Sequence, residues 1–318
     1  MPEADRGRLN IPTWTLGGRQ FWGDVAFFHG WRIQHNVFTG HYRLLDPRDV
    51  RQAWGSLAAC RQVLDDQQQR LGLKPMSGRA VVLIHGVVRS SKSFAAMKTA
   101  LERDGAIVVP FDYPSTRMTI DSSSEYLHQT LESLEGVDRI DFVVHSMGGL
   151  VVRSYLRNHR DPRLGRLVML GVPNHGARLA NILRDVSLFK AIFGPAGQQL
   201  IEGNGEFIDS LPAPDFPFAV VAGARGDTEG YNPLIPGDDD GTVSVDCTRL
   251  AGATDFMTVP AIHSFLMGNP DVIAATLRFL SSGALRESGE AQPVCPAPAP
   301  EPIPAAEPAP VPAPVPAP

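Results

Sequence analysis

Residues 141–152 read DFVVHSMGGLVV, and this stretch decides the fold of the chain. The apolar run Phe142–Val144 predicts a buried strand, and apolar residues between Leu150 and Leu156 then recur at helical spacing. A sharp turn between strand and helix would lift the Ser146 side chain into the open and aim the first helical N–H groups at whatever it attacks. Two glycines follow the serine and let the two backbones approach closely. The alternative is an ordinary strand–turn–helix with an inert serine, and the rest of the chain must decide.

The composition is that of an ordinary globular protein, since 43% of the 318 residues are hydrophobic and 20% are charged. This length fits one large domain of roughly 250 residues with extensions, or two smaller domains. The net charge of −5 offers no basic surface, so we expect no nucleic-acid partner. The widely spaced cysteines, Cys60, Cys247 and Cys295, form neither a disulfide framework nor a C-x-x-C pair. Although two of them could bridge, we expect free thiols in a reducing compartment.

The sequence shows no sign of a targeting or membrane-spanning segment. Its first thirty residues mix acidic and basic side chains and contain no apolar signal-peptide core. No run of eighteen apolar residues occurs, so no transmembrane helix is expected. These features predict a cytoplasmic protein.

Residues 1–77 are predicted to form an extension that packs on the core. Residues 1–20 resemble a loose arm, and the aromatic and β-branched residues that follow are interrupted by glycine-containing turns. This punctuation predicts a small antiparallel hairpin or meander. Asp46-Pro47 then predicts the start of a helix that runs through about Arg70 with one apolar stripe. The predicted strands lie near 21–28, 31–38 and 41–45.

Residues 78–282 alternate between apolar strands and helices, which predicts an α/β domain with a mostly parallel sheet flanked by helices. Ligands of such sheets bind at the carboxyl ends of the strands, where Ser146 is expected. The predicted strands are Ala80–Ile84, Ala106–Phe111, Ile140–Val144, Arg166–Leu170 and Phe218–Ala222, with short extended pieces at Thr242–Val245 and Phe256–Val259. The predicted helices lie near 91–103, 121–134 and 150–158, and a last helix runs from Pro270 to about Leu280.

Two segments break this alternation. An amphipathic stretch within 177–216 is predicted to be either a lid near the active loops, as in a lipolytic enzyme, or a crossover helix packed on the sheet. The composition changes after the last helix, and twelve of the last 26 residues, from Pro293 on, are proline, mostly alternating with alanine. Such a composition cannot pack a core, so residues 283–318 are predicted to be a disordered, polyproline-II-like tail.

The turn at Ser146 resembles the nucleophile elbow of the α/β-hydrolase fold. The usual pattern there is G-x-S-x-G, and Val144 takes the place of the first glycine. A serine hydroxyl needs a base that takes its proton and an acid that orients the base. In this fold the expected chain order is serine, acid, histidine.

Three histidines follow the serine and compete for the role of base. His159 falls in the helix after the elbow, and His175 precedes every candidate acid. His263 follows a β-like piece and precedes the last helix, where the histidine of this fold belongs. We therefore interpret His263 as the base, with a structural loop histidine as the alternative.

The acid is expected in the loop after Phe218–Ala222. Asp240 stands at a tight turn before an extended piece, so we favour Asp240, then Asp239, with Asp227 as a further alternative. The same cluster could be a calcium loop, but the EF-hand pattern would put Pro236 and Cys247 at ligand positions. Only a nonstandard calcium site stays open. The carboxylates of this region are Asp227, Glu229, Asp238, Asp239, Asp240 and Asp246.

The oxyanion hole needs two N–H donors, and the N–H of Met147, directly after the nucleophile, should be one of them. The other should come from the loop after the first core strand, which reads HGVV over 85–88. Glycine lets the backbone turn an amide inward, which points to the N–H of Val87. His85 precedes the serine and ends a strand, so we interpret it as structural.

Four separated pieces resemble α/β-hydrolase lipases and esterases, over roughly residues 78–282. The PNHG piece resembles bacterial triacylglycerol lipases and the lipases related to GPI-inositol deacylases. In those families an Asp-Gly-x-Val turn supplies the acid and the base follows some two dozen residues later, and the gap in this chain is 263 − 240 = 23. The resemblance implies a catalytic triad of Ser146, Asp240 and His263. The four pieces are VLIHG (82–86), VHSMGG (144–149), VPNHG (172–176), and DGTV (240–243) with His263.

These features predict a serine hydrolase that cleaves carboxylic esters through an acyl-enzyme and needs no cofactor. The expected partner is an ester or lipid substrate, with contact to a lipid interface through the lid and a protein partner for the Pro-rich tail as further options. A thioesterase or acyltransferase with the same triad is the alternative among enzymes. A non-catalytic scaffold, whose tail docks into an aromatic-lined groove, is the alternative from another class.

Overall fold

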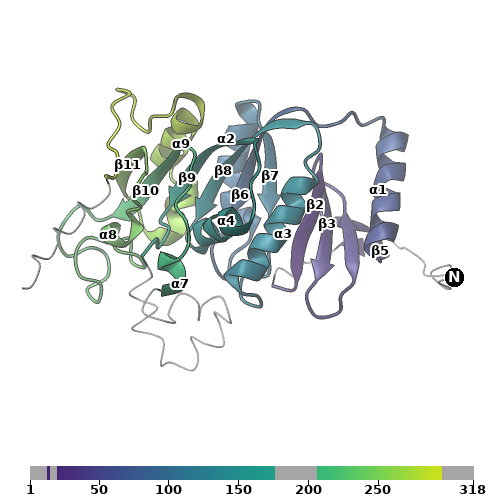
Figure 1. Cartoon of the computed structure of the whole chain (residues 1–318), viewed down its shortest axis with the longest axis horizontal. Coiled ribbons are helices and arrows are strands. Elements are labelled where there is room, and N and C mark those ends of the chain that lie inside the picture. The colour runs from purple at the N-terminus through teal and green to yellow at the C-terminus, as the bar shows by residue number, and fades with distance from the viewer. Residues whose placement is uncertain (1–12, 15–19, 176–205, 296–318) are drawn as a thin grey trace, which may run out of the picture.

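The described part of the chain folds into two sheets that lie side by side (Figure 1). The computed structural model describes residues 13–14, 20–175 and 206–295. The larger sheet, sheet B, has the strand order β11-β10-β9-β8-β6-β7, and its neighbouring strands all run parallel. Its strands are β6 (Gly78–Ile84), β7 (Ile107–Phe111), β8 (Val137–His145), β9 (Leu164–Leu170), β10 (Phe218–Ala224) and β11 (Asp255–Pro260).

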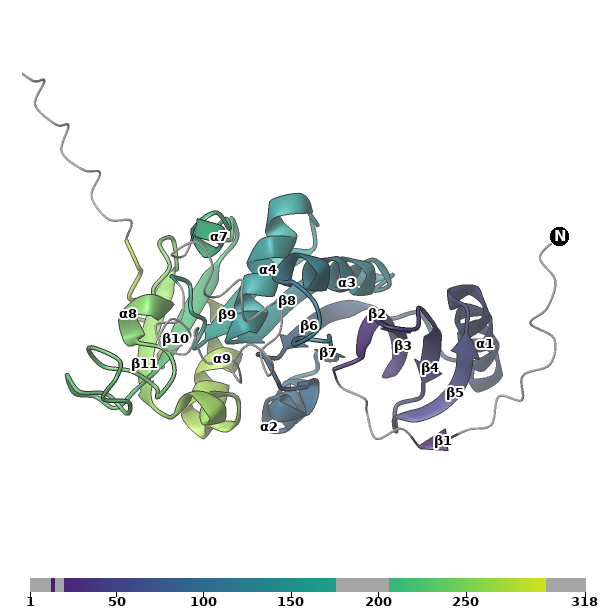
Figure 2. The same cartoon turned by 90° about the horizontal axis from the view of Figure 1, so that it is seen from below.

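Helices cover both faces of sheet B. Figure 2 shows α3 and α4 on one face and α2 and α9 on the other. Successive side chains of a strand point to opposite faces, so Val82 and Ile84 join the apolar cluster of α3 and α4, whereas Val81 and Leu83 join that of α2 and α9. This double burial explains why the strands read as unbroken apolar runs. The helices are η1 (Ser91–Phe94), α2 (Ala95–Arg103), α3 (Ile120–Glu132), α4 (Met147–Asn158), η3 (His263–Gly268) and α9 (Pro270–Ser282).

The strand order of sheet B reverses at β6. From β6 the chain runs outward to the edge strand β7 and then returns to β8, on the other side of β6. The helices that follow β6 and β8 cover opposite faces, so the two connections diverge at the carboxyl ends of these strands (Figure 2). Open α/β sheets bind their ligands at such a reversal. Ser146 lies there, directly after β8.

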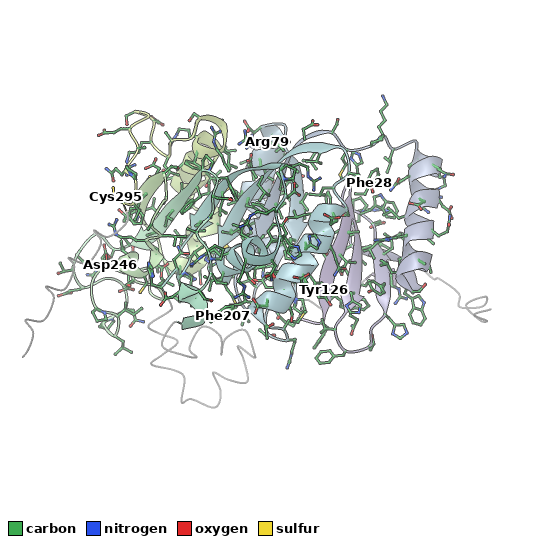
Figure 3. The ribbon with its side chains drawn as sticks, in the orientation of Figure 1. Phe28, Arg79, Tyr126, Phe207, Asp246 and Cys295 are labelled. Atoms are coloured by element: carbon green, nitrogen blue, oxygen red, sulfur yellow. The ribbon has the colours of Figure 1, made fainter. Side chains whose placement is uncertain are left out.

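Sheet A is antiparallel, with the order β1-β5-β4-β3-β2, and it confirms the predicted N-terminal meander. Its strand β2 lies nearest to sheet B, and the Asp24 N–H donates to the Asp112 carbonyl after β7 at 2.8 Å. Tyr126, which α3 places beside sheet A (Figure 3), stacks on His35 of β3, with ring centroids 5.8 Å apart. The elements are β1 (Thr13–Trp14), β2 (Trp22–Phe28), β3 (Trp31–Asn36), β4 (Tyr42–Leu45), β5 (Val50–Gly55) and α1 (Leu57–Leu71).

The helix predicted from Asp46 to about Arg70 is wrong over its first part, where the chain forms β5. Asp46 Oδ1 accepts hydrogen bonds from two backbone N–H groups that follow it, which builds a turn. Asp49 has a φ of 63°, which no right-handed helix contains. The helix begins only after Ser56, whose hydroxyl caps the first turn by accepting the N–H of Ala59 at 3.2 Å.

The extended piece predicted at Thr242–Val245 is also different in the structure. Ser244 makes one isolated bridge with Asp239, and the short helix α8 (Val245–Thr248) follows. The Ser244 hydroxyl accepts the N–H of Cys247 at 3.3 Å, so this residue caps a helix rather than continuing a strand.

The C-terminal tail begins later than the predicted residue 283. Leu285 is buried, and its N–H donates to Oδ2 of Asp255 at 2.8 Å, while the Arg286 guanidinium donates to Oδ1 of the same carboxylate at 2.8 Å. The Val294 N–H then donates to the Ala253 carbonyl at 2.9 Å. The chain is thus held at the β11 end of sheet B as far as the exposed Cys295.

Two predicted features fall wholly or largely outside the described residues. These are the Pro-Ala stretch 296–318 and most of the lid candidate 177–216, of which α7 (Glu206–Asp209) is described. In the part of the chain that the structure describes, no helix is both long and apolar enough to cross a bilayer.

Candidate active site

Ser146 lies on the turn between β8 and α4, with φ of 53° and ψ of −129°. L residues rarely adopt this region, which costs about 1–3 kcal/mol and persists only where the surroundings enforce it. The Ser146 N–H donates to the Leu170 carbonyl at 3.0 Å, and its own carbonyl accepts the Gly149 N–H at 3.0 Å. A side chain at Gly148 would lie 2.8 Å from the His85 carbonyl oxygen, so glycine is required for this close approach. The Ser146 side chain is left partly exposed on a rigid turn.

His263 and Asp240 form a buried hydrogen-bonded pair. Nδ1 of His263 lies 2.7 Å from Oδ2 of Asp240, and the His263 N–H donates to the Asp240 carbonyl at 2.8 Å. Oδ1 of Asp240 accepts the N–H groups of Thr242 and Val243 at 3.0 and 2.7 Å. These donors suit a carboxylate, so Nδ1 of His263 is assigned the proton and Nε2 is the basic nitrogen.

The C-terminal end of β9 connects this pair to the serine. The Leu170 carbonyl accepts the Ser146 N–H. The next residue is Gly171, where a Cβ would lie 3.1 Å from both Oδ2 of Asp240 and Nδ1 of His263. The Ser146 backbone and the Asp240–His263 pair therefore contact two successive residues at the end of β9, Leu170 and Gly171.

His145 contacts His263, although its sequence position predicts no role in the site. Its Nε2 lies 3.0 Å from the His263 carbonyl, and the two ring centroids are 4.5 Å apart. Burial, with further contributions from His263 and Arg89, holds the pKa of His145 well below its usual value. The neutral ring fixes the backbone of His263 without adding a positive charge beside it. The sequence offers no signal for this contact except that His145 precedes Ser146.

The three consecutive carboxylates have different partners. Asp238 accepts two backbone N–H groups at 225–226, at 2.7 and 3.0 Å, and Asp239 accepts the N–H of Asn232 at 3.1 Å. Asp240 is the one of the three that bonds a histidine within the described residues. Asp227, the further alternative, accepts N–H groups of the two residues at 229–230. Among the described residues, no cluster of three or more His, Cys, Asp or Glu side chains could hold a metal ion.

The other histidines considered for catalysis lie apart from this pair. His159 lies 3.0 Å from Glu125 of α3, and His175 is exposed and lies 3.7 Å from Asp209. His85 is fully buried and stacks on Tyr113, with ring centroids 4.5 Å apart. Its contacts agree with a structural role.

The loop after β6 lies against Ser146. A Cβ on Gly86 would come 2.9 Å from the Ser146 Cβ, so the two backbones touch. Within the described part of the chain, the N–H of the next residue, Val87, donates to no other group. The Met147 N–H is the first of α4. The two predicted oxyanion donors therefore belong to the two connections that diverge at the sheet reversal.

Comparison with protein families gives one match to a domain of unknown function, DUF7379, over residues 43–199. The match begins in β4, includes the turn at Ser146 and extends beyond β9. No curated protein matches the chain.

Among solved structures, the chain is similar to the Bacillus licheniformis lipase BlEst2 in its propeptide form, at 20% identity and a TM-score of 0.47 over 59% of this chain and 47% of that one. The chain thus spans about half the length of that protein. It is also similar to the metagenomic carboxyl esterase MGS0156, at 20% identity and a TM-score of 0.48 over 59% and 65% of the two chains. A third similar structure is the Paleococcus ferrophilus monoacylglycerol lipase, at 17% identity and a TM-score of 0.48 over 64% and 95%.

The fold itself is decided by the geometry of sheet B. Its strands are parallel, its order reverses once at β6, and its serine sits on a strained strand-to-helix turn beside the loop that follows β6. By these features the chain has the α/β-hydrolase fold, with an antiparallel sheet added at its N-terminal side.

Proposed function

We propose that this chain is a serine hydrolase that cleaves carboxylic esters, with Ser146, His263 and Asp240 as its catalytic triad. One observation carries the proposal: a buried histidine–carboxylate pair, joined at 2.7 Å, lies against Gly171, the residue after the Leu170 carbonyl that accepts the N–H of a serine on a strained turn. An inert serine has no use for such a turn. A carboxylate that fixes the tautomer of a histidine is the arrangement that activates a serine hydroxyl.

The proposed reaction proceeds through an acyl-enzyme. Ser146 Oγ attacks the acyl carbonyl carbon while its proton moves to Nε2 of His263, and Asp240 stabilises the imidazolium that forms. The oxyanion is received by the N–H groups of Val87 and Met147, and each such donor is worth about 3 kcal/mol. The bond to the alcohol then breaks, and His263 returns the proton to the leaving oxygen. Water repeats the sequence on the acyl-enzyme and releases the acid.

Exposed apolar side chains around these loops support a substrate with an apolar acyl group. Of the eight large apolar side chains that are exposed among the described residues, five belong to loops that carry the proposed site. One of them directly follows the proposed donor Val87, two lie within two residues of His263, and two lie in the loop between β10 and Asp240. A surface of this kind favours an apolar ligand over a charged one. The five are Val88, Tyr231, Leu234, Ile262 and Phe265.

Hydrolysis of a p-nitrophenyl ester series from acetate to palmitate tests the proposal. Wild type and a matched serine variant, Ser281→Ala, should turn over the esters and react with a fluorophosphonate probe, whereas Ser146→Ala should do neither. Ser281 lies near the end of α9, and its hydroxyl donates to the Arg278 carbonyl at 3.0 Å. Turnover that persists in Ser146→Ala would contradict the assignment.

Other outcomes of the series separate the alternatives. Probe labelling without ester turnover would favour a thioesterase or an acyltransferase. The absence of both would favour a non-catalytic scaffold. A maximum at long chains would mark a lipase, and a maximum at short chains would mark an esterase with a small acyl site.

A further inference from the structure

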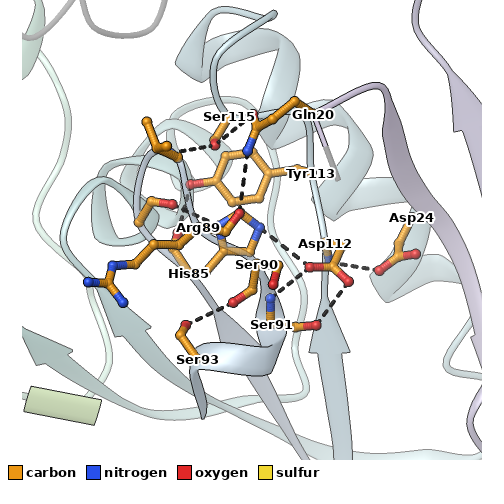
Figure 4. Close-up of polar contacts among 12 residues, drawn as sticks. Gln20, Asp24, His85, Arg89, Ser90, Ser91, Ser93, Asp112, Tyr113 and Ser115 are labelled. Carbon is orange, nitrogen blue, oxygen red and sulfur yellow. Dashed lines mark hydrogen bonds and ion pairs between the residues drawn. The ribbon is translucent and has the colours of Figure 1, made fainter. Parts of the chain in front are cut away.

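The N-terminal part of the chain contacts the middle of the loop that follows β6 (Figure 4). The side-chain amide of Gln20 lies between this loop and the chain after β7. Its Nε2 donates a hydrogen bond to the Arg89 carbonyl at 3.4 Å. Its Oε1 accepts hydrogen bonds from the Thr116 hydroxyl at 2.7 Å, from the Thr116 N–H at 3.0 Å and from the Ser115 hydroxyl at 3.3 Å. Oγ of Ser115 in turn accepts the N–H of Val88 at 3.1 Å. One amide therefore ties two points of the loop to the strand end beside it.

This loop needs such support, because its backbone is strained. Val88 has a φ of 60°, in the left-handed region that β-branched residues avoid. A residue stays there only when its surroundings over-determine it. The hydrogen bond from the Val88 N–H to Ser115 fixes the orientation of the peptide group between Val87 and Val88. The neighbouring peptide group carries the N–H of Val87.

Both ends of the same loop bind one carboxylate, Asp112, that sheet A holds in place. Asp112 accepts the N–H and Oγ of Ser91 at 2.7 and 2.9 Å and lies 3.6 Å from Nε2 of His85 (Figure 4). From sheet A, Asp24 accepts the Asp112 N–H at 2.7 Å, and Arg32 donates to Oδ2 of Asp112 at 3.0 Å. Although burial raises the pKa of Asp112, the charges of Arg32 and His85 bring it below its usual value. Asp112 is therefore an ionised anchor for both ends of the loop.

We propose that Gln20, in the segment that leads into β2, is a positioning residue for the loop after β6, which carries the proposed oxyanion donor Val87. Gln20 touches no reacting atom. It acts through Ser115 and Val88 and keeps the Val87 N–H directed at the place where the oxyanion forms. This inference rests on the proposed hydrolase activity, because it gives that loop its function.

The experiment compares Gln20→Ala with a matched control, Gln52→Ala, in the full chain. Gln52 lies in β5 of sheet A, and its amide donates to Asp46, in the turn before β5, at 3.1 Å. For Gln20→Ala we expect kcat on p-nitrophenyl esters to fall about tenfold with KM nearly unchanged, because the loss falls on the transition state. Inhibition by an aryl boronic acid, whose serine adduct places an oxygen in the oxyanion position, should weaken by the same factor. Gln52→Ala should change neither quantity.

Two further variants show whether Gln20 acts through the proposed contacts. Gln20→Glu keeps the acceptor for Thr116 and loses the donor to Arg89, so it should retain more activity than Gln20→Ala. Ser115→Ala should lower kcat, and the double variant with Gln20→Ala should lose less than the product of the two single losses, because both act on one bond. Independent, multiplying losses would contradict the route through Ser115.

Backbone amide hydrogen exchange over residues 85–91 gives a readout that does not depend on activity. Gln20→Ala should speed exchange in this segment, and Gln52→Ala should not. Unchanged kcat and unchanged exchange in Gln20→Ala would overturn the proposal, as would equal losses in both glutamine variants. If wild type neither turns over esters nor reacts with the probe, the proposed function fails, and the exchange result still decides whether Gln20 holds the loop.

Discussion

The candidate site of sheet B and the inner side of sheet A place their polar side chains in different ways. Ser146, Asp240 and His263 all lie on turns beyond the carboxyl ends of parallel strands. In sheet A, by contrast, Asp24 and Arg32 lie within strands β2 and β3 and are buried, with exposed fractions of 1% and 8%. Polar groups at strand ends can meet a substrate, whereas charges buried within strands can only join one part of the protein to another. Substitutions in the first region should therefore change chemistry, and those in the second should change stability or the position of a loop.

The largest effect is expected at the acid. Asp240→Asn keeps the shape of the side chain but can present an amide to His263 and favour the wrong tautomer, so kcat should fall by about 10⁴. The matched control is Asp239→Asn, because Asp239 bonds backbone N–H groups rather than the histidine. Its kcat should stay within a few-fold of wild type in the same ester assay. Retained activity in Asp240→Asn, or equal losses in both variants, would remove Asp240 from the proposed triad.

A smaller loss is expected where the loop after β6 touches the serine. In Gly86→Ala the new methyl would lie 2.9 Å from the Ser146 Cβ and 3.0 Å from Nδ1 of His145. The displacement should lower kcat about 10- to 100-fold with little change in Tm. Gly268→Ala is the control, because a Cβ there meets nothing within 4 Å. A wild-type kcat in Gly86→Ala would show that the loop and the serine do not depend on this contact.

The buried Asp24 of sheet A should make the stability of the fold depend on pH. Burial raises the pKa of Asp24 to about 7, against the lowering effect of Arg32. Between the ordinary value of 3.8 and about 7, the folded chain keeps a proton that the unfolded chain releases, so stability should fall as pH rises through this range.

Asp24→Asn cannot titrate, so its Tm should fall less than that of wild type between about pH 5 and pH 8, by a few degrees. Thermal melts across this range provide the measurement, with Asp66→Asn as an exposed control on α1. Parallel Tm curves for wild type and Asp24→Asn would mean that Asp24 is already ionised throughout.

The smallest effect is expected at the exposed apolar side chains. Phe265 and Phe38 are 68% and 64% exposed, but only Phe265 stands two residues from His263. Phe265→Ser should raise KM for long-chain esters a few-fold relative to short-chain esters, because about 1 kcal/mol of apolar contact is lost. Phe38→Ser, on the hairpin of sheet A, should leave this ratio unchanged. The same shift in both variants would exclude a local acyl contact.

Much of the fold could be predicted because sheet B obeys a simple rule. Strands covered on both faces must be apolar throughout, and β6, β8 and β10 are recognisable for that reason. The first part of the helix predicted from Asp46 was wrong because Val50 and Trp54 have helical spacing by coincidence. The chain turns there instead, because the Asp46 side chain accepts backbone N–H groups and Asp49 adopts a positive φ. A periodic pattern does not reveal such local exceptions.

The residues of the candidate site could be predicted from the sequence, but the contacts that hold them and their loops in place could not. Chain order pointed to His263 and the turn at residues 240–243 favoured Asp240, and in the structure Asp240 rather than Asp239 contacts His263. The contact between Asp24 and Asp112 joins residues 88 positions apart, so no local pattern could pair them. One signal was present, since Asp24 interrupts the apolar run of β2 on a buried strand.

The course of residues 284–295 over the β11 end of sheet B decides how this protein could be attached to a surface. Cys295 is exposed there, at the end of the molecule opposite to Phe28 of sheet A (Figure 3). Cys60 is buried, and burial raises its pKa to about 11, so it resists thiol reagents near neutral pH. With the partly buried Cys247 replaced by serine, a maleimide support would capture the chain through one sulfur. Sheet A and the Gln20 contact would then face away from the support, and the immobilised protein would keep a single orientation.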